Sequence, residues 1–176
     1  LQGLLKTDLG FNPKEILTTE IDLSRGGYEG RDPLVAFYRP LLEKVSHLPG
    51  VQAAGIINLI PVRDWGSNSD VHITGQPPYP LNQPMLAENR LVSVGYFDAM
   101  GIRLVHGRSL STALDTPDKP AGSVVVNEAF AKKYFPNQRA LGRLFEDNDE
   151  GDALATTDRI VGVVGSARYL DRQSGV

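Results

Sequence analysis

Residues 16–57 constrain the fold most, because they predict a strand, a helix and a second strand joined by short connections. Residues 16–23 alternate apolar and polar side chains with a period of two, the pattern of a half-buried strand. Residues 51–57 (VQAAGII) predict the second strand. A strand, a long helix and a strand in this order favour a right-handed βαβ unit with parallel strands.

The helix between these strands has clear boundaries and one apolar stripe. Asp32 can cap free backbone N–H groups, and Pro33 is tolerated in the first helical turn. Pro49-Gly50 ends the helix. The stripe recurs at helical spacing and comprises Leu34, Tyr38, Leu41, Leu42, Val45 and Leu48.

The rest of the chain predicts shorter elements, in keeping with its 18 glycines and 12 prolines. Residues 58–90 are rich in proline and predict a long irregular loop with one short strand at Val71–Thr74. A strand at 88–94, a helical turn at 95–100 and a strand at 102–106 follow. Ser123–Val126 predicts a strand, and Asn127 then caps a short helix that ends at Pro136. Strands at 143–145 and 159–164 enclose an acidic loop.

Composition excludes several classes of protein. A hydrophobic content of 41% supports a packed core and argues against disorder. The net charge of −3 argues against nucleic-acid binding. The absence of cysteine excludes disulfides and thiolate metal sites. No apolar run reaches the ~18 residues of a membrane span. The chain starts at Leu1 without a signal peptide, so we expect an excised fragment of a longer protein.

Motifs for metal or phosphate binding are weak. The acidic run at 146–152 places Glu146, Asn148 and Glu150 at the first calcium-loop positions, but Thr157 stands where a bidentate Glu is needed. We interpret the run as a solvated hairpin loop. Gly165-Ser166 follows a strand but lacks the further glycines or lysine of a phosphate loop. We therefore predict no metal site and no cofactor site.

A catalytic site would require side chains that are distant in sequence to converge. The three histidines are His47, His72 and His106, and they form no HExxH motif. No G-x-S-x-G motif is present. A hydrolase would need Asp64, Asp70, His72 or Glu88 to converge in one cleft. We predict that the chain is not an enzyme and assign no catalytic residues.

The loop at 58–90 supports an alternative function as a binding module for a small ligand or peptide. Trp65 lies in a polar part of the loop, where an aromatic side chain serves as a recognition anchor or as a lid on the core. The segment Pro77-Pro78-Tyr79-Pro80 is typical of a stiff surface loop or of a polyproline ligand. A pocket lined by Trp65 and Tyr79 would favour this alternative.

The second half of the chain carries a series of short motifs. They read Tyr96-Phe97 with Met100-Gly101-Ile102, Gly107-Arg108, Asp115, Val124–Ala131, Tyr134-Phe135-Pro136 and Ile160–Gly165. In this order and spacing the series resembles the MacB-like periplasmic core domain of bacterial ABC transporter permeases, and most closely the duplicated acidobacterial-type permeases of the MacB/FtsX superfamily. Residues 8–13 (DLGFNP) are similar to the stretch just outside the first membrane helix in those permeases.

The resemblance implies an α+β or α/β mixed fold with three parts. Residues 1–15 would be a juxtamembrane segment, residues 16–92 a βαβ porter-like part with the long loop 58–90, and residues 93–176 a smaller α/β subdomain. In the family the core continues into another strand–helix–strand segment, so we expect a chain truncated before that closing segment. Asn127 would cap a helix, Gly101 and Gly107 would permit turns, and Phe97, Phe130 and Phe135 would fill the smaller core.

The resemblance also implies a function without catalysis. The domain would lie on the periplasmic side of the bacterial inner membrane and would relay ATP-driven motion to a substrate or partner protein. The implied partners are its own transmembrane helices, a separate cytoplasmic ATPase domain, a periplasmic partner protein and a second copy in a homodimer. Cofactors and nucleic acid are not expected.

Overall fold

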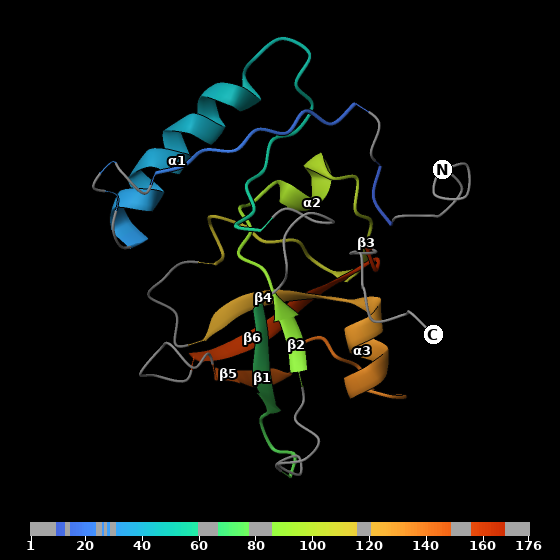
Figure 1. Cartoon of the computed structure of the whole chain (residues 1–176). Helices are drawn as coiled ribbons and strands as arrows, with labels where there is room; N and C mark the ends of the chain where they lie inside the picture. The colour runs from blue at the N-terminus through green and yellow to red at the C-terminus, as the bar shows by residue number, and fades with distance from the viewer. Residues whose placement is uncertain are drawn as a thin grey trace, which may run out of the picture.

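A computed structural model describes residues 10–12, 15–23, 26, 28, 31–59, 67–77, 86–115, 121–148 and 156–167. The elements in chain order are α1 (Arg31–Ser46), β1 (Ser67–Ile73), β2 (Leu86–Asn89), α2 (Tyr96–Ala99), β3 (Leu104–Gly107), β4 (Gly122–Asn127), α3 (Glu128–Tyr134), β5 (Leu144–Asn148) and β6 (Thr156–Val164). Figure 1 shows one sheet with α3 beside it, α2 above it and α1 standing away from it.

The sheet has six strands, and β6 is its central strand. Its order is β2-β1-β5-β6-β3, with β4 also paired to β6. β5 pairs with the first half of β6 and β3 with its last residues, both antiparallel, whereas β4 runs parallel along most of β6. β5 and β3 therefore share one edge of β6, and β4 occupies the other edge.

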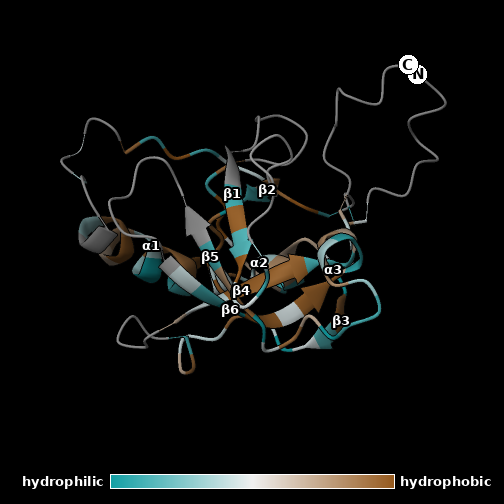
Figure 2. Cartoon of the chain, turned by 90° about the horizontal axis from the view of Figure 1, so that it is seen from below, coloured by the Kyte–Doolittle hydropathy of each residue, from teal (hydrophilic) through white to brown (hydrophobic). Residues whose placement is uncertain are grey.

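β4 and β6 are buried on both faces of the sheet, which explains their nearly continuous apolar sequences. Val126 and Val163 belong to a core that includes Phe135 and Phe145, whereas Val164 belongs to a second core with Tyr96 and Ile102. Neighbouring valines thus point to opposite faces, as the period of a strand requires. Figure 2 shows the hydrophobic colour along β4. The prediction of strands here is confirmed.

The prediction that Asn127 caps α3 is also confirmed. The Phe130 backbone N–H donates to Asn127 Oδ1 at 2.7 Å. The cap starts the helix directly at the end of β4, and Phe130 then packs against Phe145 with ring centroids 6.2 Å apart. The Tyr134 hydroxyl donates to the Leu86 carbonyl at 2.8 Å, so α3 also holds β2.

The prediction of strands at 16–23 and 51–57 is wrong. Of the predicted βαβ unit, only the helix, α1, forms. Residues 16–23 are extended but belong to no strand of the sheet, and Leu17 is 97% exposed. Residue Ile57 makes one isolated bridge to Val92. Alternation with a period of two describes a strand only when a partner covers its apolar face, and no such partner lies among the described residues.

The prediction of an irregular loop over 58–90 is wrong in part. The short strand predicted at Val71–Thr74 is confirmed within the longer β1, and β2 also falls within this stretch and pairs antiparallel with β1. β1 also pairs with β5, so the sheet joins strands from both sides of the predicted boundary between residues 92 and 93. The mixed α/β class, the short helix at 96–99 and the strands near 104 and 144 are confirmed.

Candidate functional site

Two segments distant in sequence connect the α1 region to the sheet. We call residues 54–58 and 91–96 together the joint. The Ser93 backbone N–H donates to the Ile56 carbonyl at 2.9 Å, and the Asn58 N–H donates to the Leu91 carbonyl at 3.1 Å. Two side chains reinforce this pairing: Ser93 Oγ accepts from the Ile56 N–H, and Asn58 Oδ1 accepts from the Leu91 N–H.

Two glycines allow the joint segments to approach closely. A Cβ on Gly55 would lie 2.4 Å from the Tyr96 Cα, which is a severe clash. Gly95 has a φ of 87°, a left-handed conformation that favours glycine, and its Cβ would lie 2.6 Å from the Ala54 carbonyl oxygen. Any side chain at either position would push the two segments apart.

A small hydrophobic core stabilises the joint. Tyr96, Ile102 and Val164 are buried in it, and Ile57 and Phe11 pack against them. The Asn12 backbone N–H donates to the Met100 carbonyl at 3.1 Å, which holds the segment at 10–12 to the end of α2. Residues 15–53, which include α1, are thus attached to the sheet at both ends around α2 (Figure 1). We call the described residues between 15 and 53 the arm and the described residues between 67 and 167 the sheet lobe.

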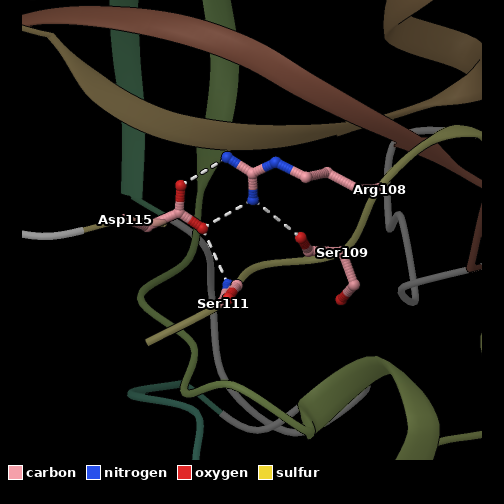
Figure 3. A network of polar contacts seen from close by, with 4 residues as sticks. All are labelled: Arg108, Ser109, Ser111 and Asp115. Atoms are coloured by element: carbon pink, nitrogen blue, oxygen red, sulfur yellow. Dashed lines mark hydrogen bonds and ion pairs between the residues drawn. The ribbon is translucent and has the colours of Figure 1, made fainter. Parts of the chain in front are cut away.

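A polar network fixes the loop after β3 to the sheet lobe. The Arg108 guanidinium donates to both carboxylate oxygens of Asp115, at 2.8 and 2.6 Å, in a bidentate ion pair (Figure 3). Arg108 also donates to the Ser109 carbonyl, and the Ser111 N–H donates to Asp115 at 2.7 Å. The Arg108 N–H donates to the Val161 carbonyl on β6, so the network is anchored to the central strand.

The ion pair lowers the pKa of Asp115 well below its usual range. The main cause is the hydrogen bonding from Arg108, and the hydroxyl of Ser123 and the N–H of Ser111 add to it. The Asp115 side chain is only 13% exposed, so the carboxylate is held in its charged form within the fold. Its fixed charge and saturated contacts point to a bracing role for the network.

The described members of the hydrolase hypothesis do not gather in one cleft. Asp70 is exposed on β1, and His72 lies opposite Glu146 on β5 with 3.8 Å between Nδ1 and Oε2. Glu88 on β2 forms an ion pair with Arg90. Within the part of the chain described, no group of three His, Asp or Glu side chains could hold a metal ion.

Other candidates lie just after α1 or outside the described residues. The His47 ring donates from Nδ1 to the Glu43 carbonyl at 2.6 Å, a structural contact in the last turn of the helix region. Asp64, Trp65, Tyr79 and the acidic loop around Glu150 lie outside the described residues, and the binding and calcium hypotheses there stay untested. No helix among the residues described has the length and hydropathy to cross a membrane.

Comparison with known proteins finds a similar fold among solved structures. No family model matches the chain, and no curated protein matches it. The periplasmic region of MacB from Actinobacillus actinomycetemcomitans superposes with a TM-score of 0.50 and 21% identity, over 72% of this chain and 49% of that structure.

The chain has the MacB periplasmic fold. The resemblance seen in the sequence motifs is therefore confirmed at the level of the fold. Two further structures have lower TM-scores. A domain of a protein described as a permease from Porphyromonas gingivalis gives 0.47 at 15% identity, covering 74% of this chain and 49% of that one. The extracellular domain of the noncanonic ABC-type transporter YknZ from Gram-positive bacteria gives 0.45 at 13% identity, covering 73% of this chain and 57% of that one.

The chain spans about half the length of the MacB region that it matches. Within this MacB-like fold, sequence reasoning missed both the joint and the ion pair. Arg108 and Asp115 are both in the motif series, and their opposite charges at a spacing of seven residues could have indicated a loop closed by an ion pair. No sequence pattern indicates the joint, because its hydrogen bonds connect residues more than thirty positions apart.

Proposed function

We propose that this chain is an extracytoplasmic, non-enzymatic domain of an ABC transporter permease that relays ATP-driven motion to a substrate or partner protein. The observation that carries the proposal is the fold shared with the periplasmic region of MacB. The proposed location is the periplasmic side of the inner membrane. The proposed partners are the protein's own transmembrane helices, a separate cytoplasmic ATPase domain, a periplasmic protein and a second copy in a homodimer.

The division into an arm and a sheet lobe supports a mechanical role. A relay needs an element that receives a displacement, a rigid body that carries it and a defined connection between them. The sheet lobe has a core on both faces of β4 and β6 and a bidentate ion pair bracing its loop. The joint connects the arm to this body through paired backbone and a small apolar core.

Hydrogen exchange on the native membrane protein tests the relay. We expect the backbone amides of Ile56, Asn58 and Ser93 to change their exchange rates when ATP is added, since the joint transmits the displacement. The amides of Ile160 and Val163, which lie in the core of the sheet lobe, should keep their rates because the lobe moves as a rigid body.

The control is the 176-residue chain alone, which should show no response to ATP. A response in the isolated chain would indicate direct nucleotide binding and contradict the relay. Identical exchange at the joint with and without ATP, in a native protein that hydrolyses ATP, would also contradict it.

A further inference from the structure

An open pocket lies beside α3, away from the joint and from the Arg108 network. It has a volume of about 700 Å³, within the range of ligand sites of about 300–1,000 Å³. One wall is a face of α3 formed by Glu128, Ala131 and Lys132, and Phe135 at the C-terminal cap of the helix extends this wall. β3 and the turn at 136–141 complete the pocket.

The pocket has an apolar floor and a basic rim. Phe135, Ala140 and Val163 line it and are 2%, 6% and 5% exposed, so the floor is part of the main core. Lys132, Arg139 and His106 also line the pocket. Lys132 and Arg139 are exposed cations that have no ion pair or hydrogen bond from their side chains to any residue of the described ranges.

Lys132 and Arg139 differ in this from four other basic residues of the sheet lobe, each of which contacts a partner within the described residues. Arg108 pairs with Asp115, Arg143 donates to Gln138, Arg159 donates to the Gly142 carbonyl, and Lys133 lies over the Tyr134 ring. The whole chain carries a net charge of −3, so these two neighbouring basic side chains oppose the overall sign. Such a rim attracts acidic groups and repels cations.

The polar groups of the pocket match a peptide. The side-chain amides of Asn137 and Gln138 line it, and an amide both donates to and accepts from a peptide backbone. A fatty acid could use only its carboxylate with these amides, because its acyl chain carries no donor or acceptor along its length. Glu128 lies on the same helix face one turn before Lys132 and would repel acidic residues toward the Lys132 and Arg139 end.

We propose that this pocket binds a short acidic, partly apolar peptide segment of a partner protein. Apolar residues of the segment contact the floor at Phe135 and Val163, and its carboxylates contact Lys132 and Arg139. The proposal goes beyond the permease function and stands on the pocket alone. It therefore holds or fails whether or not the chain relays motion.

The test is the binding of a fluorescent Glu-Leu-Glu-Leu-Glu-Leu peptide to the 176-residue chain at low salt. We expect weak, saturable binding that falls about tenfold in the double variant K132E/R139E, because the rim charge is reversed. Added salt should weaken the binding, since the contacts are exposed to solvent. The matched control is Lys133→Glu, next in sequence but outside the pocket, and it should bind as the unaltered chain does.

Several outcomes would overturn the proposal. These are no binding to the unaltered chain, an equal loss in Lys133→Glu, or equal affinity for the Gln-Leu-Gln-Leu-Gln-Leu peptide. Displacement of the peptide by dodecanoate would assign the pocket to lipid acids instead. Self-association of the chain that is lost in K132E/R139E would assign it to a second copy. The unfolding temperatures of all variants should agree, because both substituted side chains are exposed.

Discussion

At the residue scale, the Arg108–Asp115 pair shows how two side chains brace a loop that has little secondary structure. The pair is partly buried, bidentate and supported by the backbone N–H of Ser111, which donates to Asp115. Removing one charge leaves the other without its partner. The resulting loss of free energy of unfolding is larger than the loss from breaking an exposed surface pair. The sign of the pKa change at Asp115 then sets how stability depends on pH.

We expect Asp115→Asn to lower the free energy of unfolding by about 2 kcal/mol at pH 7, the loss typical of a hydrogen bond to a charged group. The pKa of Asp115 is lower in the folded chain than the value of about 3.9 in the unfolded chain. The stabilisation is therefore complete above that unfolded value and is lost as the pH falls toward the folded pKa. Urea unfolding from pH 7 to pH 3 should show the two chains converging below about pH 4.

The control for this prediction is Asp98→Asn at an exposed carboxylate on α2. It should change stability by less than about 0.5 kcal/mol at every pH. A deficit for Asp115→Asn that stayed constant down to pH 3 would show that the charge of Asp115 does not stabilise the fold.

At the scale of single elements, local signals predicted α3 and its neighbours well. Asn127 follows a run of valines and precedes a helical apolar pattern, and the cap and the strand both form there. Gly101 and Gly107 adopt φ values of 63° and 77°, as the predicted turns require. Phe135 is buried, and Phe97 and Phe130 pack against the two cores, as expected.

We expect Asn127→Ala to lower the free energy of unfolding by about 1 kcal/mol, because the Phe130 N–H loses its acceptor at the start of α3. Asn127→Asp should retain most of this stability, since a carboxylate also accepts at this position. Thermal unfolding of both variants measures the difference. Unchanged stability in Asn127→Ala, together with a loss of function in the native protein, would contradict a purely structural role.

The elements that sequence reasoning missed depend on contacts distant in the chain. Residues 16–23 alternate like a strand, but alternation says nothing about whether a partner strand exists. β2 has few strand-forming residues and is held by β1 and by the Tyr134 hydroxyl, which comes from a helix 48 residues away. The pocket beside α3 likewise combines β3, α3 and the turn at 136–141, and no motif indicates it.

At the scale of the whole molecule, the motif series predicted the fold better than the periodicity did. The series names no contacts, yet its order matches a fold that the structure confirms. The periodicity described each segment by itself, and it predicted two strands beside α1 that do not form. The proposal of an extracytoplasmic permease domain rests on the fold, the arm and the joint.

Location is the most direct test of this account. Since the chain has no cysteine, Ala113→Cys would place a single exposed thiol in it within the native protein. We predict labelling by a membrane-impermeant maleimide in intact cells with a permeable outer membrane. Ala140→Cys, at a position only 6% exposed, should stay unlabelled and report that the domain is folded. Labelling of Ala113→Cys only after the cytoplasmic membrane is lysed would contradict the account.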